Sequence, residues 1–226
     1  MKPLKRPTLA EQAYEELQSQ IMLGSLPAGL RLFPEEIAGR LAISPTPVKE
    51  ALAQLEREGL VEVATRRGST VRRFTRDDMD QIYGARLLLE CRAVEIGIAK
   101  DRVTPAFLSR LEHVYNDHMS ELAQHTTEGL AESIRLDRDF HELIVSLAAN
   151  TLISGWHRTA IRQTQTIRNY SLARYDGGRL REEHKAIIEG LRRQAVKATL
   201  AAMKFHLDAS LGEFLSRPPE DLPTRL

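Results

Sequence analysis

The chain has 226 residues, of which 42% are hydrophobic and 28% charged, and its formal net charge is +1. This composition is typical of a soluble globular protein with one large or two ordinary domains, and it excludes a largely disordered chain and a general polyanion binder. Because no run approaches the roughly 20 apolar residues of a membrane span and the N-terminus has no apolar signal core, we expect a cytoplasmic protein without membrane contact.

The first 74 residues show helix signals followed by short extended runs. Thr8 and Glu11 form a capping-box pattern ahead of an apolar stripe with a four-residue period. Spacing and turn residues predict, in order, a helix over 8–23, a turn over 24–32, helices over 34–41 and 45–59, and a hairpin of strands 60–64 and 70–74. This order is that of a winged helix-turn-helix, so we expect residues 1–74 to form a DNA-binding domain.

From Thr75 onward the strand signals disappear and the chain reads as helix after helix. Caps and breaks predict helices over 75–100, 104–122, 128–149, 151–172, 178–190 and 195–215. We therefore expect a mainly α protein, whose residues 75–216 form an antiparallel all-helical bundle with a binding function. The polar, Pro-rich tail 217–226 is expected to be frayed.

The helix predicted to begin at Pro45 has the composition of a DNA-reading element. In a helix-turn-helix the second helix enters the major groove with its N-terminal residues against base edges. Ser44 and Thr46 can bond phosphate or base there, and Lys49 lies one turn further along the same face. An ordinary capped surface helix has the same spacing, so the pattern alone leaves both interpretations open.

Residues 23–71, with LGSLPAGLRLFPEEIAGRLAISPTPVKEALAQLEREGLVEVATRRGSTV, resemble the DNA-binding domain of GntR-family regulators. The family motif is similar to L-x-E-x-x-L-A-x-x-L-x-V-S-R-T-P-V-R-E-A-L, followed by a wing that carries glycine. The resemblance implies that the operator contacts are Ser44, Thr46, Lys49, Arg67 and Gly68. Pro45 and Lys49 stand where the family usually has arginines, so we expect a different operator or one read more by shape. One small winged helix rarely supplies enough contact, so we also expect a homodimer on double-stranded DNA.

Histidine placement separates two groups among the seven histidines. Four fall singly on amphipathic helices and are interpreted as surface or partly buried polar residues: His113, His118, His125 and His157. Asp137 and His141 are spaced i, i+4 and project from one helix face, and antiparallel packing can bring His184 and His206 to a similar height. Three imidazoles and one carboxylate would suit Zn, Ni, Mn or Fe, leaving open positions for water or a carboxylate.

The pattern D-x-x-F-H at Asp137, followed by Glu183-His184 and His206-Leu207, resembles FCD, the effector-binding domain of the FadR-like branch of that family, over residues 77–215. All four ligand positions of its metal-binding members are filled, which implies a repressor whose operator affinity is controlled by a small organic acid at a divalent transition metal. An anionic effector needs a further cation. Arg86, which matches a frequent family arginine, and Arg168 are expected to supply it, with surface ion pairing left open for both.

Two other functions fit parts of the pattern. An Asp/His₃ centre with open positions could activate water, which would make the chain a metal-dependent hydrolase or isomerase, although no separate general base is evident and the DNA-binding half would be unexplained. A structural metal without an effector is the second. The single cysteine, Cys91, lies in an apolar helical run and is expected to be a buried structural thiol.

Overall fold

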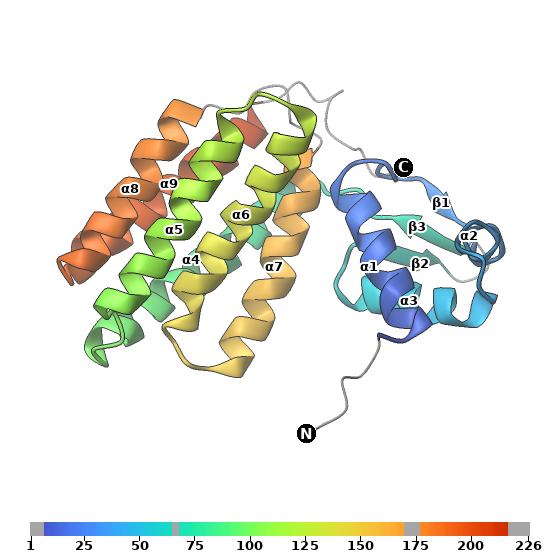
Figure 1. Ribbon diagram of the computed structural model, residues 1–226, viewed down its shortest axis with the longest axis horizontal. Helices are drawn as coiled ribbons and strands as arrows, with labels where there is room; N and C mark the ends of the chain where they lie inside the picture. The colour runs from blue at the N-terminus through green and yellow to red at the C-terminus, as the bar shows by residue number, and fades with distance from the viewer. Residues whose placement is uncertain (1–6, 65–67, 170–176, 217–226) are drawn as a thin grey trace. The chain divides into compact units, whose positions relative to one another are not determined.

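The computed structural model describes residues 7–64, 68–169 and 177–216. By their contacts these residues divide into two compact units between Phe74 and Thr75, and each unit is described by itself (Figure 1). The expectations for Arg67 and for the tail 217–226 fall outside the described residues. Among the helices that are described, none is long and apolar enough to cross a membrane.

The first unit is a winged helix-turn-helix, as predicted. Its elements are α1 (Leu9–Met22), β1 (Arg31–Leu32), α2 (Pro34–Leu41), α3 (Pro45–Arg57), β2 (Val61–Ala64) and β3 (Gly68–Val71). The three strands form an antiparallel sheet in the order β1-β3-β2. Strand β1 corrects the prediction of a plain turn over 24–32, because Arg31 pairs with Thr70 and Leu32 with Ser69. A two-residue strand is too short to show alternation in sequence.

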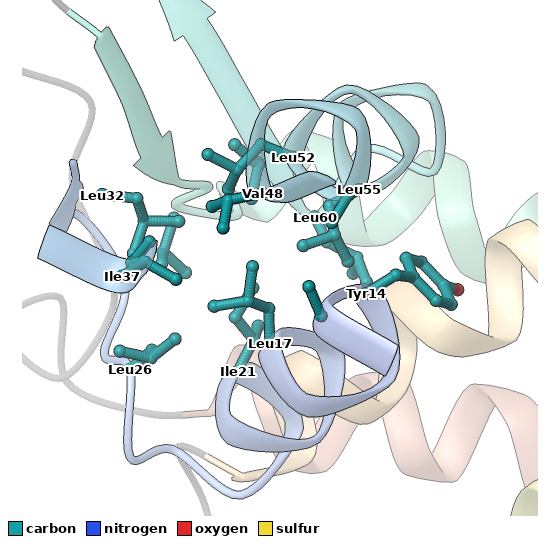
Figure 2. Close-up of a cluster of buried hydrophobic side chains, with 14 of the residues drawn as sticks. Tyr14, Leu17, Ile21, Leu26, Leu32, Ile37, Val48, Leu52, Leu55 and Leu60 are labelled. Atoms are coloured by element: carbon teal, nitrogen blue, oxygen red, sulfur yellow. The ribbon is translucent and has the colours of Figure 1, made fainter. Parts of the chain in front are cut away.

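An apolar core holds helix α3 in this unit. Side chains of α1 and α3 face one another across it in Figure 2, and the loop and sheet residues Leu26, Leu32 and Leu60 close its edges. Val48 and Leu55 are fully buried, and each such side chain contributes about 1.5–3 kcal/mol. The inner face of α3 is therefore fixed by packing, while its N-terminal turn stays available at the surface.

The second unit is an antiparallel helical bundle, also as predicted. Its helices are α4 (Arg76–Ala99), α5 (Pro105–Leu122), α6 (Thr127–Ser146), α7 (Thr151–Asn169), α8 (Gly177–Arg192) and α9 (Val196–Leu215). Neighbour contacts run α4, α7, α6, α5, α8, α9 and back to α4, so the helices close a ring (Figure 1). Threonine caps set several helix starts, and at Thr75 the capping box with Asp78 begins α4. The polar residues discussed below are buried inside this ring.

Cys91 lies on α4 and is partly buried, less deeply than expected. Burial, followed by the nearby charges of Glu90 and Glu95, raises the pKa of its thiol to about 11. With this raised pKa the sulfur is protonated at ordinary pH. Because only the thiolate is a nucleophile, the protonated thiol reacts slowly.

We therefore expect Cys91 to react slowly with iodoacetamide. At pH 8 the thiolate fraction falls from about 1 in 4 for an ordinary thiol to about 1 in 1,000. The higher intrinsic nucleophilicity of a more basic thiolate offsets part of this loss, which leaves a rate roughly 10- to 20-fold below that of glutathione. Mass spectrometry of the native chain measures the rate, and reaction as fast as after unfolding in urea would contradict the assignment.

Candidate functional site

The four predicted ligand residues converge inside the ring. Asp137 and His141 come from α6, His184 from α8 and His206 from α9, and all four are buried. One ligand atom from each lies within 4.8 Å of the others. Asp137 Oδ1 is 3.5 Å from the Nε2 atom of His184 and 3.9 Å from that of His141. Residues separated by up to 69 positions in the chain thus form one cluster, drawn from three helices.

Two glutamates determine which ring nitrogen of His141 and of His206 faces the centre of the cluster. His141 Nδ1 donates to Glu90 Oε2 at 2.7 Å, and His206 Nδ1 donates to Glu183 Oε2 at 2.8 Å. Since a carboxylate can only accept, each Nδ1 carries a proton, and in the neutral form of the ring Nε2 then presents a lone pair. The Nε2 atoms of His141 and His206 then face each other at 3.2 Å. Two lone pairs at that distance repel unless a proton or a metal ion lies between them.

The donor set and its spacing fit a transition metal. With bonds of about 2.1 Å, a metal ion separates its ligand atoms by roughly 3.0–4.2 Å, a range that contains the distances of 3.2, 3.5 and 3.9 Å between individual pairs of these atoms. Both ring nitrogens of His184 are buried without a hydrogen-bond partner among the described residues. Burial, reinforced by neighbouring His206, lowers the pKa of His184 well below its ordinary value. Burial also lowers the pKa of His141 to about 4, although Glu90 opposes this. Both imidazoles are therefore in the neutral form that binds metals.

Glu90 ties this cluster to a second group of buried polar residues. Its Oε1 atom accepts from Arg86 Nε at 2.9 Å and from His157 Nε2 at 3.0 Å, while Oε2 accepts from His141. Burial acts to raise the pKa of Glu90, but Arg86 and the two histidines outweigh it and hold the pKa well below its ordinary value. The buried carboxylate is thus ionised and fixes the orientation of a proposed metal ligand.

Replacing Glu90 should therefore weaken metal binding without removing a ligand. Glu90→Gln can present its amide N–H₂ to His141 and so disturb the tautomer, and loss of such an orienting partner typically costs about 10- to 100-fold in metal affinity. Glu95→Gln is the matched control, because Glu95 lies on the same helix but pairs with Arg92 at the surface. Competition with a chromophoric chelator measures both, and equal affinities would refute the role given to Glu90.

Arg86 is fully buried, which rules out the surface ion pair left open for it. Its Nε atom is used by Glu90, but Nη1 and Nη2 have no hydrogen-bond partner among the described residues. Burying charged N–H donors without acceptors costs free energy, so a ligand that supplies acceptor atoms to this edge would be stabilised. Arg168 lies on α7, and its side chain is outside the described residues.

Sequence reasoning was wrong for two histidines, did not single out Glu90, and named Glu183 only as part of a motif. His113 and His125 are exposed, whereas His118 and His157 are fully buried. His118 continues the buried stripe of Phe107 and Leu111 on α5, a spacing that could have revealed it. Its ring centroid lies 5.3 Å from that of His184. The sequence gives a weaker indication for the two glutamates. Glu183 adjoins His184, and Glu90 follows Arg86 by four residues, which places the two on one helix face.

Three of the residues proposed to contact DNA lie on the accessible first turns of α3. Ser44, Thr46 and Lys49 are all exposed at the start of α3, and the Ser44 side chain makes no capping hydrogen bond there. Lys49 Nζ lies 3.2 Å from Glu35, an exposed ion pair of the kind that contributes little and can exchange for phosphate. In the wing, Gly68 begins β3 with a φ of 79°, which favours glycine.

Comparison with known proteins covers both units. Residues 9–71 match the bacterial regulatory proteins of the gntR family, and residues 81–209 match the FCD domain. The HTH-type transcriptional regulator YdhC of Bacillus subtilis is 29% identical over 199 residues, 87% of either chain. The "Probable D-xylose utilization operon transcriptional repressor" of Paenarthrobacter nicotinovorans is 27% identical, covering 93% of this chain and 90% of that one. The structure of Escherichia coli McbR/YncC aligns with a TM-score of 0.76 at 20% identity, over 93% of this chain and 98% of that one.

Proposed function

Because the chain belongs to the GntR family of bacterial regulatory proteins and carries an FCD domain, it is a DNA-binding transcriptional regulator, and we propose that it is a repressor controlled by a small organic acid. The family and the named relatives are regulators and not enzymes, so the hydrolase or isomerase interpretation is set aside. Repression is supported by one relative that is named as a repressor. In this proposal two copies of the chain bind two half-sites of the operator.

We assign the metal-binding role to the buried Asp/His cluster described above. Asp137, His141, His184 and His206 would hold the ion, with Glu90 and Glu183 orienting two of the imidazoles. Mixed imidazole and carboxylate donors suit Zn, Ni, Mn or Fe. When bound, such an ion supplies open coordination positions that accept carboxylate oxygens.

The observation that carries the effector proposal is the buried edge of Arg86. Its two Nη atoms can form a two-pronged pair with a carboxylate, the geometry that guanidinium groups favour. Glu90 bonds both Arg86 and His141, so an acid held by Arg86 would bind next to the carboxylate that orients one of the proposed ligands. We therefore expect the effector to carry at least one carboxylate, with Arg168 as a further candidate contact.

Helix α4 offers a direct route from this site to the DNA-binding unit. It carries Arg86 and Glu90, and it begins at Arg76, five residues after β3 ends at Val71. An acid that binds Arg86 adds charge-assisted hydrogen bonds to α4. A shift of that helix would be passed along the chain to the winged helix.

The test is an operator titration with a panel of small mono-, di- and tricarboxylates at fixed salt and metal. At least one acid should change the operator affinity, by about 5- to 150-fold for a typical coupling free energy of 1–3 kcal/mol. By reciprocity, operator DNA should change the affinity for that acid by the same factor. If no acid shifts operator binding, the effector proposal is wrong. A structural metal without an effector would then be the remaining interpretation of the cluster.

DNA binding itself is tested at Lys49. Lys49→Ala should weaken binding about equally on different sequences and lower the slope of log affinity against log salt by about 1, because one phosphate contact is lost. Glu35→Gln removes the partner of Lys49 but keeps the lysine, so it should preserve or raise the affinity. Fluorescence anisotropy at several salt concentrations measures both, and an unchanged slope for Lys49→Ala would exclude this contact.

A further inference from the structure

A groove on the surface of the helical unit lies between α8 and α9. Its volume is about 370 Å³, and it is lined by Arg179, Glu182, Glu183, Ala186, Ala202 and Phe205. We propose that this groove is a second ligand site, which takes a small organic cation with an aromatic or aliphatic body, and that its occupant acts on the Asp/His cluster through Glu183.

The groove has the size and the apolar surface that a small molecule requires. Small-molecule sites usually enclose about 300–1,000 Å³ and combine apolar walls with a few polar groups. Ala186 and Ala202 leave room in the walls. Phe205 is 66% exposed, so its ring stands uncovered beside the hollow. A ligand with an apolar body would cover this ring and remove it from water.

The charges of the lining residues favour a cation. Arg179 is already engaged, because it donates to Glu183 Oε1 at 3.2 Å and pairs with Glu213 through its other terminal nitrogen. Glu182 is exposed and forms no ion pair within the described part of the chain. An anionic ligand would meet Glu182 and Glu183 as like charges. An ammonium group would pair with Glu182 and could lie over the face of Phe205.

Glu183 connects the groove to the interior of the ring. The same carboxylate lines the groove, accepts from Arg179 through Oε1 and accepts from His206 Nδ1 through Oε2. A cation that approaches the groove competes for Glu183 and draws it from its present partners. The hydrogen bond that orients His206 then changes, and metal affinity with it. This last step rests on the proposed metal-binding function, whereas ligand binding in the groove does not.

A pair of probes with one body and opposite charge tests the site. Phenethylammonium and phenylacetate are titrated separately into the full chain, with and without zinc, by ligand-observed NMR. We expect phenethylammonium to bind in the groove, and we expect Phe205→Ala with Glu182→Gln to weaken it by about tenfold. Any phenylacetate bound at the separate carboxylate site should keep its affinity in this double variant. Leu88→Ala is the matched control, because Leu88 is an exposed apolar residue of α4 that does not line the groove. Saturating probe should change zinc affinity severalfold.

The outcomes separate the two parts of the proposal. Absence of phenethylammonium binding, a phenylacetate affinity that falls equally in the double variant, or full phenethylammonium binding by the double variant would overturn the groove as a cation site. Probe binding that leaves zinc affinity unchanged would overturn the link through Glu183. Probe binding to a chain that takes up no zinc would uphold the groove while refuting the proposed metal centre.

Discussion

His184→Ala and His206→Ala are each expected to lower the affinity for divalent transition metals by on the order of 100-fold or more, since even an orienting partner contributes 10- to 100-fold. Each variant removes one of four donors from a buried cluster whose ligand atoms lie within 4.8 Å. In His206→Ala the facing pair of Nε2 lone pairs also disappears, so the metal-free form loses a repulsion. Elemental analysis after dialysis, with chelator competition for affinity, measures the change.

His113→Ala is the matched control for these variants. Its side chain is 78% exposed on α5 and lies outside the cluster, so metal content should equal that of the parent. Thermal unfolding distinguishes lost metal from lost fold: zinc should raise the Tm of the parent and of His113→Ala, because ligands that bind only the folded state stabilise it. If both His184→Ala and His206→Ala still bind metal stoichiometrically, the assignment of the metal centre is wrong.

Arg86→Lys is expected to abolish the response to the carboxylate effector while leaving metal binding largely intact. Lysine keeps a positive charge beside Glu90, but it lacks the two Nη donors that a carboxylate would engage. The change in operator affinity produced by the acid should fall from about 5- to 150-fold to near 1. The measurement is operator binding with and without the acid that acts on the parent.

Arg86→Lys is preferred to Arg86→Ala because lysine keeps the positive charge beside Glu90. Arg86→Ala would leave Glu90 as an uncompensated buried charge, which typically costs about 3–5 kcal/mol of stability. Arg92→Lys, at an exposed arginine of the same helix, is the control and should respond like the parent. An Arg86→Lys variant that keeps the full response would show that the effector is held elsewhere.

Much of the fold could be predicted from local signals. Capping patterns at Thr8 and Thr75 mark helix starts that the structure confirms, because they satisfy backbone donors within four residues. Strand β1 could not be predicted, since it depends on pairing with β3 some 38 residues away. Its inward residue, Leu32, owes its burial to that pairing and to the core around it.

The candidate site shows the same division. Spacing and family resemblance singled out the four cluster residues, but they carried no information on what lies behind the imidazoles. The roles of Glu90 and Glu183 arise only when helices pack side by side and a carboxylate of one helix meets a ring of another. Burial of His157 depends likewise on Glu90, 67 positions earlier. A single polar residue on a helix does not predict which residue of another helix it will contact.

The proposed metal centre is tested most directly by anomalous diffraction from crystals of the full chain grown with zinc, recorded on both sides of the zinc absorption edge. We predict one strong anomalous peak per chain, between the Nε2 atoms of His141, His184 and His206 and beside Asp137 Oδ1. A map with no peak there, or with zinc bound only at surface residues, would contradict the assignment.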